Sequence, residues 1–127
     1  MSNLSDWNEV RVSGRLTHSP EVRKTPSGVS VCDFSLACNR YSRPDSNGEQ
    51  KKFTTFVKVT AWNKQAEYIA DNLHTGDEMI VMGVLEDDNY TPQDGTEPTH
   101  GRMKVRADDF RIGRRKSASK SESDDSQ

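Results

Sequence analysis

The first regular pattern in the chain is a strand in which apolar and polar side chains alternate. Val10, Val12 and Leu16 share one face, with arginines and a serine on the other, which is typical of a half-buried strand. Gly14, in the middle of this segment, predicts a bulge or a bend, the device by which one strand joins two parts of a closed sheet. Residues 20–28, rich in Pro, Ser and Gly, predict a turn-rich connection.

Two longer strands follow and are predicted to pair as a hairpin. The first, residues 29–41, changes its apolar parity along its length, which predicts a β-bulge near Cys32 or Asp33. A polar stretch with an Asn-Gly dipeptide at 47–48 then leads into the second strand, residues 52–62. Asn-Gly between two strands is a hairpin signal, so the two segments should lie side by side.

A helix and two more strands complete the predicted domain. Asn63 is expected to be the N-cap of a helix that runs to about His74, with Gly76 beyond its end. Residues 79–85 form an apolar run interrupted by one glycine and predict a strand that is buried or lies between subunits. The helix is expected to close one end of a barrel with an apolar stripe formed by Ala66, Ile69, Ala70 and Leu73. A last strand is expected over 101–110. Its inward residues are Met103, Val105 and Ala107, and its outward residues are Arg102, Lys104 and Arg106.

The order of these elements is strand, strand, strand, helix, strand, strand. A single helix between the third and fourth strands of a five-stranded sheet is the layout of an OB-fold barrel, an all-β class whose face binds oligonucleotides. We therefore expect one OB-fold domain over residues 1–112. Residues 113–127 contain almost no apolar side chains and predict a disordered polar and acidic C-terminal tail.

The segment 54–62 has an unusual outer face. Its apolar row is Val57, Val59 and Ala61, so the opposite face carries two aromatic rings together with a lysine and a threonine. Bases stack on exposed rings for ~1–3 kcal/mol each while Lys or Arg meets the phosphates, and sequence-tolerant single-strand binders work in this way. The alternative is that Trp62 covers a second small core or a subunit contact. The residues of the outer face are Phe56, Lys58, Thr60 and Trp62.

Other rings and cations are predicted to extend this face. Tyr41 ends the first strand of the hairpin and is expected near Phe56 or its neighbours, and Tyr90 is a third exposed-looking ring in the arm before the last strand. The phosphate contacts expected from these positions are Arg11, Arg15, Arg40, Lys51, Lys52, Lys58 and Lys104.

Composition restricts how such a face could work. The chain has 127 residues, of which 31% are apolar and 30% charged, and its net charge is −2. Residues 1–116 hold 17 basic and 17 acidic side chains, and residues 117–127 add one Lys and three acids. Any affinity for nucleic acid must therefore come from the local placement of cations and rings, because the chain has no global positive field.

The remaining chemistry is sparse. Cys32 and Cys38 lie six residues apart in one extended segment, roughly 20 Å, which predicts free thiols without a metal. Residues 1–6 lack any leader or membrane pattern, so we expect a cytoplasmic protein with no membrane contact. No cofactor and no enzymatic activity are expected, because the histidines lack a nucleophile pattern and no glycine motif cradles phosphate. These histidines are His18, His74 and His100.

Several segments together resemble the bacterial-type single-stranded DNA-binding protein family over about residues 8–112. The resemblance implies an OB fold, sequence-tolerant binding of single-stranded DNA in replication, recombination and repair, and assembly as a homotetramer or, less often, a dimer. It also implies base stacking at Phe56, Trp62 and Tyr90, and at Tyr41 within a residue or so. The segments are Asn8–Leu16, Pro20–Arg23, Phe34–Arg40, Trp62–Glu67, Leu73–Asp77 and Val81–Leu85.

The sequence departs from the family pattern in two places. The arm that includes residues 85–90 is acidic where the family is usually basic, which predicts weak or rerouted binding on that side. The end, residues 123–127, is acidic but lacks the apolar tip through which the family docks onto replication and repair proteins. A paralogue, plasmid or phage version would fit both departures.

Two other readings stay open at this point. One is a protein–protein adaptor on the same fold, such as a primosome component with residual nucleic-acid binding, which the acidic residues 86–88 and the near-neutral charge favour. The other is RNA as the ligand, because a stacking platform does not sense the 2′-hydroxyl unless a side chain is aimed at it.

Overall fold

The computed structural model describes residues 6–88, 95–97 and 101–115. The predicted order of elements is confirmed, with one short strand added near the start. The elements are β1 (Val10–Leu16), β2 (Glu21–Lys24), β3 (Ser30–Tyr41), β4 (Lys52–Trp62), α1 (Asn63–Asn72), β5 (Glu78–Asp87) and β6 (Met103–Ile112).

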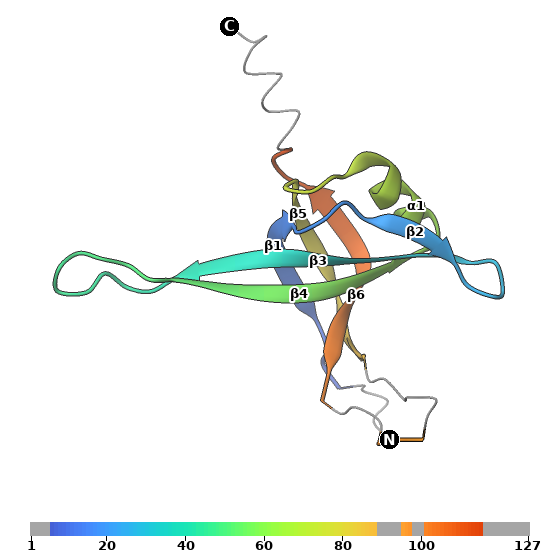
Figure 1. Cartoon of the computed structure of the whole chain (residues 1–127), viewed down its shortest axis with the longest axis horizontal. Coiled ribbons are helices and arrows are strands. Elements are labelled where there is room, and N and C mark those ends of the chain that lie inside the picture. The colour runs from blue at the N-terminus through green and yellow to red at the C-terminus, as the bar shows by residue number, and fades with distance from the viewer. Residues whose placement is uncertain (1–5, 89–94, 98–100, 116–127) are drawn as a thin grey trace, which may run out of the picture.

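Five of the strands close into a barrel (Figure 1). The sheet runs β1-β5-β6-β4-β3, and β1 returns to pair with β3 at Arg15↔Ala37 and Leu16↔Leu36. Gly14 immediately precedes the two residues of β1 that pair with β3, and a Cβ added to it would lie 2.6 Å from the Ala37 carbonyl oxygen. β1 therefore joins two parts of a closed sheet, as expected, but its register with β5 is continuous through Gly14, so the bulge predicted there is not found. The five-stranded OB barrel with one helix between β4 and β5 is confirmed.

The barrel interior contains the predicted apolar positions. Val59 and Ala61 of β4 are fully buried, and Val57 packs against the same cluster. The helix closes one end of the barrel with its apolar stripe, of which Ala66, Ile69 and Leu73 are fully buried. Burial of a branched side chain contributes ~1.5–3 kcal/mol, so these rows fix which face of each strand points outward.

The connection between β1 and β3 is more regular than expected. Residues 20–28 were predicted as a turn-rich link, but Glu21–Lys24 forms β2 and pairs with β3 through Ser30–Asp33. The turn is confined to residues 25–29, where the Thr25 and Gly28 amides donate to the Val29 and Thr25 carbonyl oxygens. All four residues of β2 are exposed, so no apolar alternation marks this strand in the sequence.

The predicted bulge in β3 is wrong. The β3–β4 register is continuous from Val31↔Trp62 to Tyr41↔Lys52. The apolar parity changes because Val31 is buried on the outer face, beside its cross-strand neighbour Trp62. The bulge lies in β6 instead, at Asp108, where the β5–β6 register shifts between Met82 and Gly83.

The helix and the last strand also differ in detail from expectation. Trp62 is the N-cap, and Asn63, predicted for that position, is the first helical residue with φ 61° and no side-chain cap. Asn tolerates this left-handed conformation better than most residues. The helix ends at Asn72, because Leu73 is already extended. Met103, expected inward, is exposed where β6 starts opposite Asp87, at the end of its ladder with β5.

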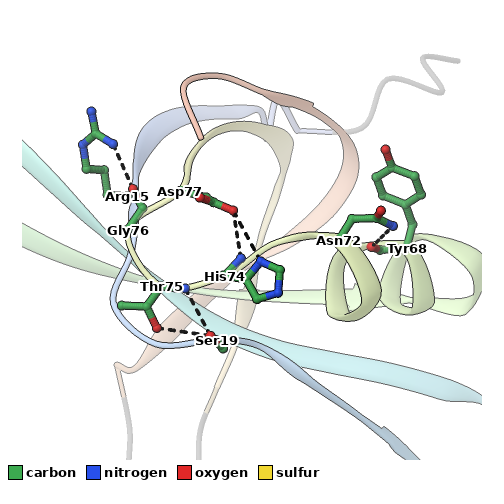
Figure 2. A network of polar contacts seen from close by, with 8 residues as sticks. All are labelled: Arg15, Ser19, Tyr68, Asn72, His74, Thr75, Gly76 and Asp77. Carbon is green, nitrogen blue, oxygen red and sulfur yellow. Dashed lines mark hydrogen bonds and ion pairs between the residues drawn. The ribbon is translucent and has the colours of Figure 1, made fainter. Parts of the chain in front are cut away.

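A polar network ties the α1–β5 loop to the end of β1 (Figure 2). The buried Asp77 carboxylate accepts the His74 amide at 2.9 Å, and Ser19 Oγ accepts the Thr75 amide at 3.1 Å. Arg15 Nη1 donates to the Gly76 carbonyl oxygen at 2.8 Å. These bonds hold the closed end of the barrel, away from the hairpin arm.

The β3–β4 hairpin projects well beyond the barrel as a long arm (Figure 1). Its tip is the predicted Asn-Gly turn, since Asp45 Oδ1 accepts the amides of Asn47 and Glu49 and Gly48 has φ 81°. Tyr41 pairs with Lys52, so the row formed by Asn39 and Thr54 separates its ring from Phe56. The hairpin prediction is confirmed, but Tyr41 lies farther along the arm than expected.

The β1–β3 crossing gives a test of the closure. Gly14→Ala should lower the free energy of unfolding by ~1–3 kcal/mol, because the added methyl overlaps a carbonyl oxygen that the ladder holds in place. Urea denaturation measures this. Ser13→Ala, one residue away with an exposed side chain, should change stability by less than ~0.5 kcal/mol. Equal effects at the two positions would show that closure does not depend on Gly14.

Candidate nucleic-acid interface

Rings and cations gather on the outward side of β3, β4 and β6, which we call the aromatic face. Tyr41 and Phe56 are 59% and 67% exposed, and Trp62 is 37% exposed. The cross-strand pairs Tyr41↔Lys52 and Ala37↔Phe56 place these side chains on one side of the hairpin, opposite the core row. The predicted site residues on this face are Tyr41, Lys52, Phe56, Lys58, Trp62 and, from the neighbouring β6, Lys104.

Trp62 stands where two open hollows meet. One, of about 740 Å³, is also lined by Lys24 and Lys64, and the other, of about 470 Å³, by Arg106 and Glu86. The ring lies outward, as the alternation predicts, and Trp62 pairs across the ladder with the buried Val31. A planar group could therefore rest on the free part of the ring with room on both sides for a connected chain.

Lys58 lies between Phe56 and Trp62 on this face. Its Nζ is 3.0 Å from Asp88 Oδ2, at the end of β5. Lys104 lies opposite Glu86 in the β5–β6 ladder. Two of the predicted cations thus lie beside carboxylates of the acidic segment 85–90.

The other predicted cations lie elsewhere. Arg15 is in the cross-strand row of Phe56, but its guanidinium is bonded to the α1–β5 loop. Arg11 is exposed on the outer surface of β1 opposite Met82, where β1 pairs with β5 and not with the hairpin. Arg40 is on the opposite side of the arm, with its guanidinium carbon 4.8 Å from the centre of the Phe53 ring, and Lys51 is in the arm loop. Tyr90 lies outside the described residues.

Two residues near this face, and Phe53 on the opposite side of the arm, were absent from the predicted site. Arg106 pairs with Thr60 across the β4–β6 contact and points outward beside Trp62. Arg23 reaches the same region from β2, a strand that the sequence pattern hid. Phe53 is 43% exposed under Arg40. The alternation within 101–110 correctly predicts that Arg106 points outward. The sequence does not predict that β6 contacts β4, which is what brings Arg106 beside Trp62.

Asp33 places a negative charge at the edge of the aromatic face. Its carboxylate accepts hydrogen bonds from Thr60 Oγ1 and Arg23 Nη2, each at 2.8 Å. Partial burial by itself raises the pKa of Asp33, but these two hydrogen bonds and the charges of Arg23 and Lys58 outweigh burial and lower the pKa below its ordinary value of 3.8. Asp33 therefore stays ionised and holds Arg23 beside the hairpin.

The two thiols carry no reactive chemistry. Both are free, and burial, with the charge of Asp33 added, raises the pKa of Cys32 to about 11. Burial also raises the pKa of Cys38, so both are protonated near neutral pH. Within the described ranges, His, Cys, Asp and Glu side chains form no group of three that could hold a metal ion. No helix in the described part of the chain is long and apolar enough to cross a membrane.

Comparison with known proteins gives a consistent result for most of the chain. A sequence model described as the single-strand binding protein family matches residues 7–112. Single-stranded DNA-binding protein 2 of Chlorobaculum tepidum is 40% identical over 114 residues, covering 89% of this chain and 76% of that protein. Single-stranded DNA-binding protein 3 of Listeria innocua is 41% identical over 88 residues, covering 69% of this chain and 53% of that protein, so the match spans about half of its length.

Solved structures agree on the fold. A Plasmodium falciparum SSB in complex with single-stranded DNA superposes with a TM-score of 0.74 at 20% identity, covering 88% of this chain and 99% of that one. A deletion mutant of the single-stranded DNA binding protein from Thermus aquaticus gives a TM-score of 0.70 at 26% identity, covering 87% of this chain and 52% of that one. The first likeness supports the barrel alone.

The lowered pKa of Asp33 predicts a pH-dependent contribution to stability. Because the native pKa lies below the unfolded value, the contribution is present above the unfolded pKa and is lost as pH falls through the native pKa. Asp33→Asn should therefore lower the free energy of unfolding by about 1 kcal/mol at neutral pH, with the difference shrinking below about pH 4. Denaturation at a series of pH values measures it. Asp71→Asn, an exposed change on α1, should show no such trend.

Proposed function

The chain belongs to the single-strand binding protein family, and we propose that it binds single-stranded DNA without strong sequence preference. The observation that carries the proposal is the aromatic face, where three exposed rings lie on one side of a single hairpin. In the described part of the chain, the exposed surfaces of these rings are left open to solvent. Successive bases could stack on them at ~1–3 kcal/mol each.

The proposed contacts follow from the placement of each residue. Tyr41, Phe56 and Trp62 stack bases, and Lys52, Lys58 and Lys104 meet phosphates on the same face. Arg11, Arg15, Arg40 and Lys51 remain proposed contacts for a strand that continues around the barrel or the arm, and Tyr90 remains one on sequence grounds. Because the hairpin extends past the barrel (Figure 1), a DNA strand could follow the hairpin from Trp62 toward Tyr41 over most of the length of the hairpin.

A second copy of the chain is proposed to cover the outer side of β1 and β5. Trp7 is 89% exposed and lines a shallow hollow with Met82 and Val84, and Ile80 is 41% exposed on the same strand. The alternation along β5 explains this, because Met79 and Val81 are buried while Ile80, between them, points outward. An apolar patch on an otherwise polar surface marks an association site. A homotetramer, or a dimer, is the proposed assembly.

The proposed cellular role is protection and handling of single strands during DNA replication, recombination and repair, in the cytoplasm with the nucleoid. The proposed role is non-enzymatic. The adaptor reading remains the second candidate, because Asp88 and Glu86 place acidic groups beside the aromatic face, as a protein partner with a basic surface would need. Titration with oligo(dT), oligo(rT) and duplex DNA separates these readings.

Trp62 gives the direct test. Oligo(dT) should quench Trp fluorescence, and Trp62→Ala should remove most of the quench and weaken binding by ~1–3 kcal/mol, because a stacking partner is lost. Trp7→Phe is the control, since Trp7 lies on the β1–β5 side and its replacement should leave the quench in place.

Circular dichroism confirms folding of each variant before titration, because Trp62 is only 37% exposed and pairs with the buried Val31. Unchanged affinity of folded Trp62→Ala would contradict the stacking role.

The assembly is tested on the outer side of β5. Ile80→Glu should shift the protein to smaller species in sedimentation velocity, because a charge replaces apolar surface at the proposed interface. Val22→Glu is matched to it, since Val22 has the same 41% exposure but lies on β2, away from the patch. If both variants keep the wild-type mass, the β1–β5 side is not the interface.

A further inference from the structure

Two acidic side chains from the end of β5 reach the cations of the aromatic face. Asp88 Oδ2 lies 3.0 Å from Lys58 Nζ, and Glu86 Oε2 lies 3.1 Å from Arg106 Nη1. Lys58 lies between the rings of Phe56 and Trp62, and Arg106 lies beside Thr60, the next outward residue of β4. The carboxylates therefore occupy the positions at which a phosphate would meet these two cations.

The position of Asp88 is set by the fold. Its side chain is only 17% exposed, and its backbone amide donates to the Arg102 carbonyl oxygen at 2.9 Å, at the start of the β5–β6 connection. Lys58 and Arg106 remain about half exposed. Ion pairs with such exposure contribute little to stability, so the main effect of these carboxylates is on the charge that the face presents.

This charge matters for how a strand would bind. Each phosphate neutralised by a free lysine or arginine adds about −0.7 to the log–log salt slope of single-strand binding. A phosphate that takes Lys58 from Asp88 leaves a bare carboxylate beside the strand, so the local charge is not cancelled. Two potential phosphate contacts then add little to affinity, and base stacking carries a larger share of binding.

We propose that Asp88 and Glu86 are tethered competitors of the DNA backbone for Lys58 and Arg106, and that they set how strongly binding depends on salt. The inference rests on the proposed function and names the residues that tune it. It accounts for an acidic segment within a site that would otherwise gain from positive charge. The opposite possibility is that the carboxylates orient the two cations toward the DNA strand. Neutralising the carboxylates would tighten DNA binding in the first case and weaken it in the second.

The test uses the isosteric neutral variants Asp88→Asn and Glu86→Gln, titrated with oligo(dT) over a series of salt concentrations. Asp88→Asn should tighten binding by up to about fivefold at low salt and steepen the log–log slope by about 0.7. Glu86→Gln should act in the same direction but less, because Arg106 Nε also lies 3.7 Å from Asp108 Oδ1. Asp109→Asn is the control for net charge, because Asp109 forms an ion pair of equal length, 3.0 Å, with Arg111 at the other end of β6. It should change neither quantity by as much.

A second variant identifies the cation involved. Lys58→Met combined with Asp88→Asn should abolish the gain of the single variant, because the released lysine is what meets the phosphate. Thermal unfolding checks that the variants stay folded. Unchanged binding of folded Asp88→Asn and Glu86→Gln would overturn the inference, and weaker binding would overturn it by assigning the carboxylates a positioning role. Absence of saturable oligo(dT) binding by the wild-type chain would instead refute the proposed function, and this inference with it.

Discussion

The strict two-residue period of the β3–β4 hairpin is the constraint on which the molecule depends. One side of β4 supplies Val59 and Ala61 to the barrel interior, so the other side must present Phe56, Lys58 and Trp62 to the outside. A shift of one residue in the pairing would bury the cation and expose the core row. The burial that holds the barrel together therefore also holds the aromatic face in register, and folding and the proposed binding site are specified by the same ladder.

The sequence predicts this hairpin well because its signals are local and agree with one another. Alternation gave the correct faces of β4, with Phe56 and Trp62 outward, and the Asn-Gly pair at 47–48 gave the turn. The helix stripe at Ala66, Ile69 and Leu73 was equally clear, because its period of 3.6 cannot be mistaken for a strand. The five-stranded barrel followed from element order alone.

What the sequence did not predict depends on contacts between distant segments. β2 is exposed at every residue, so only its pairing with β3 reveals it. The burial of Val31 resembled a bulge because Val31 lies on the outer side of β3, opposite Trp62 of another strand, and is buried there. The ion pairs of Asp88 and Glu86 were hidden for the same reason, since the composition of 85–90 shows that the segment is acidic but not which cations it meets. Charge placement across a barrel is a tertiary property.

The projecting arm has a consequence for how such a protein could diversify. Residues 42–51 lie beyond the barrel, are almost all exposed and add nothing to its interior, while the turn is held by the local bonds of Asp45. Substitutions there are free of the packing constraints that restrict the inner half of the same hairpin. The side chains of the arm could therefore change between lineages while the melting temperature of the domain stays nearly constant, so that one continuous hairpin combines an anchor restricted by packing with a tip that is not.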